Sequence, residues 1–77
     1  MPSFKYTVLF EPLAEGGYNV VVPAFPEICT FGETLDEARN MAQDAIACII
    51  ESAQELGEPI PPDVPYEPVK EQLSISV

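Results

Sequence analysis

Carboxylates are the side chains of this sequence that are best suited to chemistry, and Glu27, Glu33, Asp36 and Glu37 gather around the start of a predicted helix. Four such groups could bind a divalent cation, or two of them could act as an acid and a base. Asp36 and Glu37 are also explained structurally, because the positive end of a helix dipole favours acidic residues in the first turn. We therefore prefer the structural interpretation and expect neither a metal nor another cofactor.

Other catalytic devices are missing from the sequence. The chain has no histidine, which removes the usual Ser-His and Cys-His pairs. Cys29 and Cys48 follow no metal-binding spacing and have no basic neighbour, so we expect them to be buried fillers. Gly16-Gly17 lacks the lysine and the following helix of a phosphate loop. The sequence therefore predicts a protein that is not an enzyme.

The charge balance bears most directly on partners. Thirteen acidic and three basic residues give the 77-residue chain a net charge of −10. Nucleic-acid binding depends on Lys and Arg, so we do not expect this chain alone to bind DNA or RNA. A basic protein would be attracted, although the acidity could instead serve only solubility. No apolar run is long enough to span a membrane and the first residues do not form a signal peptide, so we expect a cytoplasmic protein.

Alternating residues predict a small sheet. Residues 4–11 alternate between apolar and polar side chains, and the valine-rich residues 18–22 read as a second strand. The Gly16-Gly17 pair can supply positive φ between them, so residues 4–22 are predicted to form a hairpin. Residues 28–31 are predicted to be a short third strand.

A single long helix is predicted over residues 35–56. Thr34 and Glu37 have the spacing of a capping box, and Gly57 suits the left-handed position that ends a helix. The apolar residues form one stripe, which indicates packing on one face of the sheet. Three flanking residues are interpreted either as the edge of the core or as contacts with a second subunit: Met41, Cys48 and Ile50.

The rest of the chain completes the predicted fold. Residues 58–68 contain five prolines and are long enough to run back along the helix when extended. Residues 69–77 then alternate and predict a fourth strand, which could pair within its own subunit or with a neighbour. Residues 1–77 are therefore predicted to be one α+β domain of order β-β-β-α-β, with a mainly antiparallel sheet. A domain this small is marginally stable, which favours self-association.

Residues 23–38 resemble the HicB family of antitoxins. The family motif has the form P-x-L-P-G-C-x-T-x-G-x-T-x-x-E-A, and Glu27-Ile28 stands where its commonest form has Gly-Cys. Residues 6–8, 15–18 and 57–61 are similar to the family as well. The positions that agree with the motif are Pro23, Pro26, Thr30, Gly32, Thr34, Glu37 and Ala38.

The resemblance implies a partial RNase H-like fold and a HicA toxin as partner, a small basic ribonuclease that cuts mRNA. It also implies assembly as a dimer or tetramer. Many members carry a further DNA-binding domain, which we do not find up to Val77, so we do not expect autorepression by this chain alone. Two alternatives stay open: a homo-oligomer without a toxin, and a small carboxylate- or metal-dependent enzyme.

The predicted partner-binding surface is the connector between the second and third strands, together with the acidic helix face and an exposed strand edge. Phe25 is the best anchor candidate because it is an aromatic residue in a proline-stiffened loop. Its alternative role is as a lid on the core. The predicted partner-binding residues are Pro23, Phe25, Pro26, Glu27 and Ile28.

Overall fold

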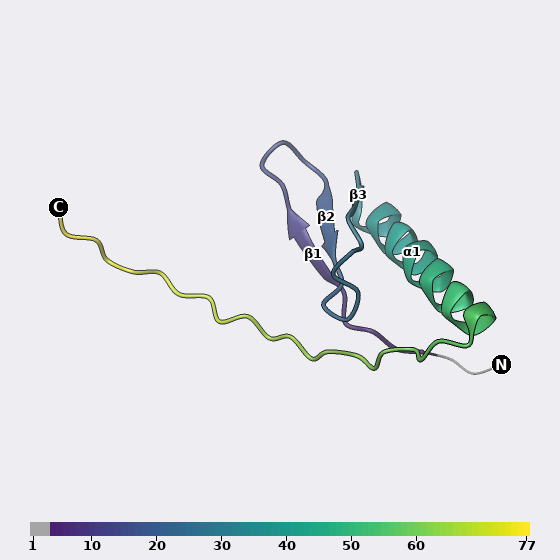
Figure 1. Cartoon of the computed structure of the whole chain (residues 1–77). Helices are drawn as coiled ribbons and strands as arrows, with labels where there is room; N and C mark the ends of the chain where they lie inside the picture. The colour runs from purple at the N-terminus through teal and green to yellow at the C-terminus, as the bar shows by residue number, and fades with distance from the viewer. Residues whose placement is uncertain (1–3) are drawn as a thin grey trace.

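The computed structural model describes residues 4–77 and has the order β-β-β-α (Figure 1). The three strands form one antiparallel sheet in the order β1-β2-β3, and a single helix follows them. The predicted α+β class and the long helix are thus confirmed. The elements are β1 (Leu9–Pro12), β2 (Tyr18–Val21), β3 (Thr30–Gly32) and α1 (Leu35–Leu56).

The hairpin forms as predicted, but its first strand is shorter. Gly16 and Gly17 have φ angles of 102° and 85°, the left-handed conformation that glycine adopts without steric cost. Leu9 pairs with Val21, the last residue of β2, so the preceding residues have no strand opposite them. Residues 4–8, here called the lead-in, therefore continue without ladder pairing. Pro23 turns the chain away just beyond this point.

The helix has its predicted bounds and its predicted caps. The Thr34 hydroxyl accepts a hydrogen bond from the Glu37 amide at 3.1 Å, and the Glu37 carboxylate accepts one from the Glu33 amide at 3.4 Å. At the other end Gly57 has a φ of 68°, and the Glu58 amide donates to the Ala53 carbonyl at 2.9 Å. At each end of the helix, some of the backbone groups that have no partner within the helix are thereby satisfied locally.

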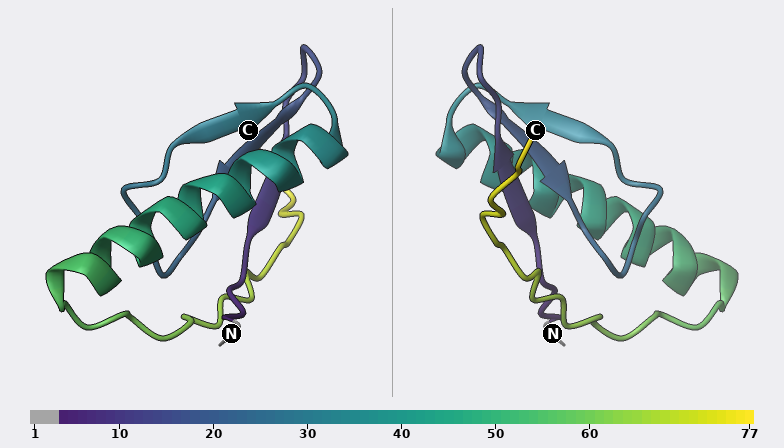
Figure 2. Two further views of the ribbon diagram at one scale, coloured as in Figure 1. Left: turned by 90° about the vertical axis from the view of Figure 1, so that its right-hand side faces the viewer. Right: turned by 90° about the vertical axis from the view of Figure 1, so that its left-hand side faces the viewer.

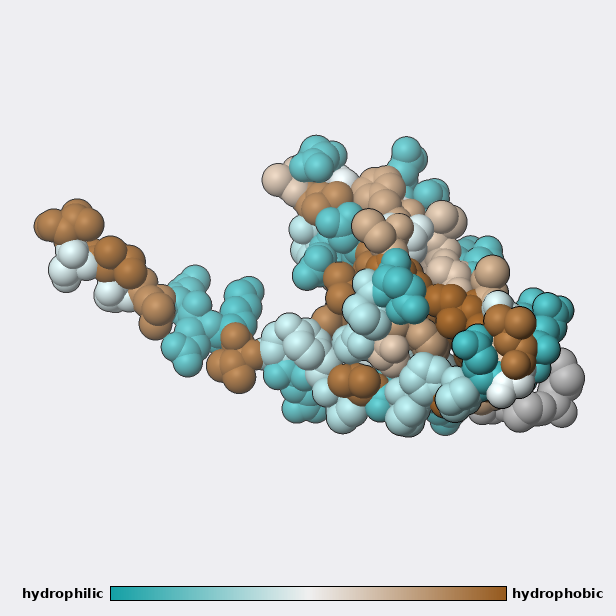
Figure 3. Space-filling model, in the orientation of Figure 1, coloured by the Kyte–Doolittle hydropathy of each residue, from teal (hydrophilic) through white to brown (hydrophobic). Residues whose placement is uncertain are grey.

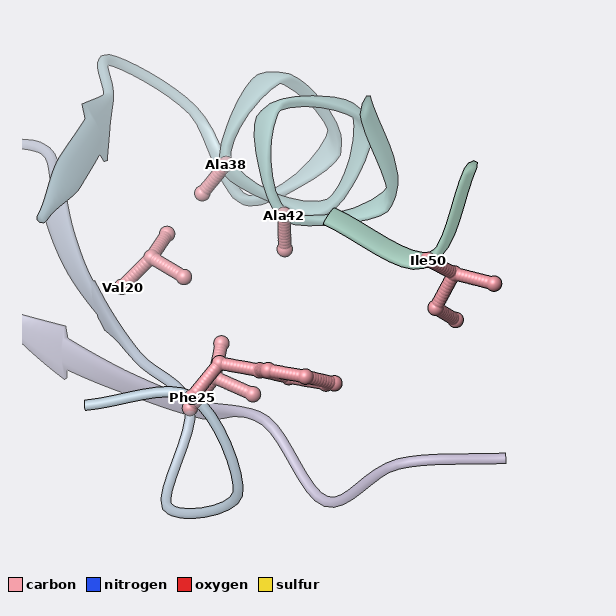
Figure 4. Close-up of a cluster of buried hydrophobic side chains, with 6 residues drawn as sticks. Val20, Phe25, Ala38, Ala42 and Ile50 are labelled. Atoms are coloured by element: carbon pink, nitrogen blue, oxygen red, sulfur yellow. The ribbon is translucent and has the colours of Figure 1, made fainter. Parts of the chain in front are cut away.

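The core lies between the sheet and α1, where small helix residues face large sheet and loop residues (Figure 4). Ala38 and Ala42 are 0% and 2% exposed, so the helix lies close over the strands. Its main contacts are with β3 and, to a lesser extent, β2. A Cβ at Gly32 would overlap Ala38. The buried residues are Val20, Val22, Phe25, Ala38, Ala42 and Ile50.

The three residues that flank the apolar stripe of the helix differ in burial. Met41 is 42% exposed and Cys48 is exposed, whereas Ile50 belongs to the core. Cys29 is exposed as well, in the loop just before β3. Neither cysteine is thus a buried filler, because the helix packs through its alanine side and the third strand starts later than predicted.

The fourth strand predicted over residues 69–77 is absent, which corrects the β-β-β-α-β order. Residues 58–77 form no strand, and the side chains of Val69, Leu73 and Ile75 are 85%, 73% and 76% exposed. A strand requires a neighbouring strand for its backbone hydrogen bonds, and this segment has none within the described chain. The RNase H-like part of the predicted fold therefore stays a prediction.

The distal segment, residues 64–77, stands away from the body (Figures 1 and 3). The radius of gyration is 15.5 Å, whereas about 11.5 Å is expected for a compact domain of this length. The longest dimension is 56 Å, against 24 Å and 19 Å for the other two. The structure thus consists of a small folded body and an extended segment.

Candidate functional site

The connector, residues 23–28, is held in two successive turns at the end of β2. The Phe25 amide donates to the Val22 carbonyl at 2.9 Å, and the Ile28 amide donates to the Phe25 carbonyl at 3.0 Å. These turns delay the third strand, which begins at Thr30 rather than at residue 28. Among the predicted partner-binding residues, Pro26 and Glu27 are exposed, while Pro23 and Ile28 are half-buried.

Phe25 is a core residue in this structure. Its side chain is 2% exposed and points beneath α1 (Figure 4). Its ring lies 4.9 Å from that of Tyr6, centroid to centroid, at an interplanar angle of 62°. This edge-to-face contact adds to the burial of the two rings. Of the two roles that the sequence left open, the lid on the core is the one observed, and Phe25 thereby fixes the connector to the body.

The acidic side chains all lie on the surface. No charged side chain is buried among residues 4–77, and all thirteen carboxylates are exposed. The single ion pair in that part of the chain joins Arg39 to Asp36 at 2.7 Å, and both side chains are exposed. Five carboxylates belong to α1, and its last turn has no basic residue. The surface of the helix is therefore strongly negative.

Two of the four carboxylates near the helix start have structural partners. Glu37 closes the capping box and Asp36 pairs with Arg39. No three His, Cys, Asp or Glu side chains in the described part of the chain approach closely enough to hold a metal ion. The capping box and the ion pair thus account for two of the four carboxylates that are grouped in the sequence, Glu37 and Asp36.

An apolar groove lies beside the lead-in and the start of β1, and the sequence did not reveal it. It has a volume of about 730 Å³ and separates the lead-in and β1 from the flank of α1. The groove exists because the helix packs over β3 and β2 and leaves its far flank uncovered. Its apolar lining consists of Phe4, Tyr6, Val8, Phe10, Ala42, Ile46, Ala47 and Ile50; Lys5, Arg39, Gln43, Glu51 and Gln54 complete it.

A second feature not predicted is a clamp between the proline-rich segment and the lead-in. Asp63 accepts hydrogen bonds from the Thr7 amide and the Thr7 hydroxyl, both at 2.8 Å. Tyr6 donates its hydroxyl hydrogen to the Pro61 carbonyl at 2.6 Å. The two hydrogen bonds from Thr7 hold the pKa of the Asp63 carboxyl below its ordinary value. These three hydrogen bonds are called the clamp below.

The clamp changes the predicted path of the proline-rich segment. Residues 58–68 were expected to run back along the helix, but they cross to the lead-in instead (Figure 1). The contact between Asp63 and Thr7 was not predicted from the sequence. No helix in the described part of the chain combines the length and the apolar character that crossing a membrane requires.

A family model of HicB-like antitoxins and several known HicB antitoxins match this chain in sequence. The family model described as a HicB-like antitoxin of a bacterial toxin-antitoxin system matches residues 6–75. Antitoxin HicB 1 of Photorhabdus laumondii is 44% identical over 59 residues, which are 77% of this chain and 38% of that protein. Antitoxin HicB of Escherichia coli K12 is 40% identical over 57 residues, which are 74% of this chain and 41% of that protein.

A shorter relative matches over most of its length. A UPF0150 protein of Thermoplasma acidophilum is 42% identical over 59 residues, which are 77% of this chain and 86% of that protein. The chain thus spans about two fifths of the length of the two HicB antitoxins and most of the archaeal protein.

Proposed function

The chain belongs to the HicB-like antitoxin family, and from this premise we propose that it binds and neutralises a small basic ribonuclease of the HicA type by protein contact. The observation that carries the proposal is the exposure of all thirteen carboxylates on a chain with a net charge of −10. A surface of this kind attracts and orients a basic protein. It disfavours direct contact with nucleic acid, since few cations are available to neutralise phosphates.

The proposed contact surface combines the connector with the outer face of α1. Pro26 and Glu27 are exposed at the tip of the connector, and the two turns below them limit its freedom. A loop that is already ordered loses little conformational entropy when it binds. Phe25 supports this surface from beneath, so its proposed role is to position the connector rather than to contact the toxin.

The position of Glu55 supports a binding role for the helix face. It is exposed near the carboxyl end of α1, whose last turn has no basic residue. A negative charge at that end opposes the helix dipole and costs about 0.3–1 kcal/mol. Helix stability therefore does not explain this residue, whereas attraction of a basic partner does.

The proposal includes self-association and a cellular location. A body this small gains stability when a second copy covers its apolar surface, so we propose a homo-oligomer. A toxin that cuts mRNA acts in the cytoplasm, and the proposed partner would place the chain there.

The proposal is tested by searching beside the gene for this chain for one that encodes a small basic protein, and by co-expressing that protein with this chain. We expect the basic protein alone to stop growth, and this chain to restore growth and to co-purify with it. Glu27→Arg should weaken the complex about tenfold, because it places a positive charge within the proposed contact. Glu15→Arg is the matched control, since Glu15 lies in the hairpin turn at the other end of β2.

A toxic neighbour that neither binds this chain nor is silenced by it would refute the proposal. An adjacent protein without toxicity, or no such protein at all, would favour a homo-oligomer without a toxin. Equal weakening by both charge reversals would exclude the connector as a specific contact surface and leave only a general electrostatic attraction.

A further inference from the structure

The distal segment has the pattern of a strand without a partner. Val69, Leu73, Ile75 and Val77 share one face, and each is more than 70% exposed. The other face consists of polar residues. Figure 3 shows the apolar groups standing clear of the body. An extended segment with one apolar face is stabilised when it pairs with a sheet edge and covers apolar surface.

The sheet offers a matching edge. β1 is an outer strand, because the sheet order is β1-β2-β3 and only β2 pairs with it. The apolar groove lies beside the lead-in and the start of this strand, which contributes Phe10, and α1 forms its other wall. A strand added to the outer edge of β1 would extend the sheet under the uncovered flank of the helix. Its inward side chains would then fill the groove, and its backbone would pair with β1.

The clamp shows in which direction the chain's own segment passes β1. Pro61 lies beside Tyr6, and Asp63 lies beside Thr7. Both stretches therefore advance in the same direction, as the two views of Figure 2 also show. A segment that stayed on its own body would have to pair with β1 in this parallel sense.

The clamp fixes how residues 64–77 align with β1 of the same chain. In this alignment the apolar residues 69–77 lie beyond the end of β1. At about 3.3 Å per residue, the last residue of β1, Pro12, lies about 16 Å beyond the clamp, whereas Val69 lies about 20 Å beyond it. Residues 69–77 therefore begin where their own β1 has already ended. The stretch that would lie beside β1 contains Pro65 and Pro68, which cannot donate hydrogen bonds to a ladder.

The chain exposes more surface than a compact monomer of its mass, which is consistent with a contact to a second chain that would cover the excess. The chain exposes 6219 Å², whereas a compact monomer of 8.4 kDa exposes about 4,600 Å². The difference is roughly 1,600 Å² per chain. Stable protein interfaces bury about 1,200–2,000 Å² in total, so two copies that cover each other's distal segments have enough surface for a stable dimer.

We propose that residues 69–77 of one copy add to the outer edge of β1 in a second copy, reciprocally, so that two chains form a strand-exchanged dimer. The face made of Val69, Leu73, Ile75 and Val77 fills the partner's apolar groove. The proline-rich segment acts as a stiff arm that carries this strand away from its own body. The proposal goes beyond toxin binding and does not depend on it, because it needs only copies of this chain.

Charge shapes the expected behaviour of this dimer. Each copy carries a net charge of −10, so the two bodies repel each other at low ionic strength. Within the contact, however, Glu71 lies on the same face as the apolar residues, and Lys5 and Arg39 line the groove. We therefore expect moderate salt to strengthen association, since it screens the long-range repulsion more than the apolar contact.

The oligomeric state is the first part of the test. Sedimentation equilibrium of the 77-residue chain should give twice the mass of 8.4 kDa. Leu73→Asp with Ile75→Asp should weaken the dimer at least 100-fold, because two buried side chains are lost at each of the two contacts. Ser74→Asp with Ser76→Asp is the matched control: it adds the same charge to the other face and should leave the dimer within a few-fold of the original.

The second part of the test decides which copy pairs with β1. A spin label is placed at Ser76→Cys in a background of Cys29→Ser and Cys48→Ser, two exposed positions. This chain is refolded together with an unlabelled, 15N-enriched chain. Broadening of the 15N amide signals of residues 9–11 requires a label that comes from the other copy. A label at Glu15→Cys, in the hairpin turn, should leave those signals sharp.

Each outcome decides the proposal. A dimer with intermolecular broadening at residues 9–11, lost in the Leu73→Asp/Ile75→Asp variant, supports strand exchange. A monomer would overturn it, as would broadening seen only when the label and the 15N are on the same chain. A dimer in which residues 9–11 stay sharp would place the interface elsewhere and would overturn it as well. None of these outcomes depends on the toxin.

Discussion

The contact between Gly32 and Ala38 explains two motif positions at the residue scale. A Cβ at Gly32 would overlap backbone and side-chain atoms of Ala38, and Gly32 does not have a positive φ. Gly32→Ala should therefore destabilise the fold by about 3 kcal/mol through overpacking alone. Gly16→Ala meets no neighbouring atom and should cost about 1 kcal/mol through its φ of 102°. Urea unfolding measures both; equal losses would contradict the close packing of β3 on the helix.

Substitutions at two neighbouring connector residues should have different effects, one mainly on the stability of the fold and the other mainly on toxin binding. Phe25 is buried and Pro26 is exposed. Phe25→Ala should lower the free energy of unfolding by about 3–5 kcal/mol. Pro26→Ala should change it by less than about 1 kcal/mol and act mainly on the affinity for the toxin. Chemical unfolding together with a binding titration checks the pair. A Phe25→Ala variant of unchanged stability would restore Phe25 as a surface anchor.

At the scale of the elements, removing an acidic side chain from α1 should have opposite effects on stability at the two ends of the helix. Glu55→Gln removes an acid from the negative end and should stabilise the fold by about 0.3–1 kcal/mol. Asp36→Asn removes an acid from the positive end and should destabilise it by a similar amount, partly through its pair with Arg39. Thermal unfolding at low salt measures both, and high salt should shrink both effects. Changes of the same sign would refute the dipole interpretation.

The clamp gives the lead-in and the proline-rich segment a defined pH dependence. The pKa of Asp63 lies below its ordinary value of 3.8, because Thr7 donates two hydrogen bonds to the ionised carboxylate. Its contribution to stability is thus fully present above pH 3.8 and is lost as the pH falls through the lowered pKa. The Thr7 amide signal should shift in that window, and Asp63→Asn should abolish the shift. An unchanged Thr7 signal down to pH 2 would show that the clamp does not form in solution.

The helix and the hairpin could be predicted from the sequence because their signals are local. Thr34 and Gly57 mark the two ends of α1, and the Gly16-Gly17 pair marks the turn. Strand length was less predictable, since β1 starts only where β2 still lies opposite it. The strand predicted over residues 69–77 is absent from the structure, because alternation shows only a capacity to pair and does not specify a neighbouring edge.

The candidate site was only partly accessible to sequence reasoning. The exposure of Pro26 and Glu27 agrees with their place in a proline-rich loop, whereas the burial of Phe25 depends on its contact with Tyr6. The groove depends on the offset of the helix toward β3, and the clamp joins residues more than fifty positions apart. Such features arise from tertiary packing and leave no local pattern.

At the scale of the whole molecule, the structure joins a small folded body to an exposed apolar segment and surrounds both with carboxylates. The apolar segment and the groove suit another copy of the chain, and the acidic surface suits a basic partner. The two surfaces lie close together, because Tyr6 lines the groove and its ring contacts Phe25 of the connector. We therefore propose a dimer that presents two connectors, each carrying Glu27.

The most direct measurement of the central claim is the ribonuclease activity of the purified basic neighbour as this chain is added. We predict that mRNA cleavage falls in proportion to the added chain and stops at a fixed molar ratio. Raising the ionic strength should weaken this inhibition, because exposed charges guide the contact. Cleavage that continues unchanged in the presence of an excess of the folded chain would contradict the claim.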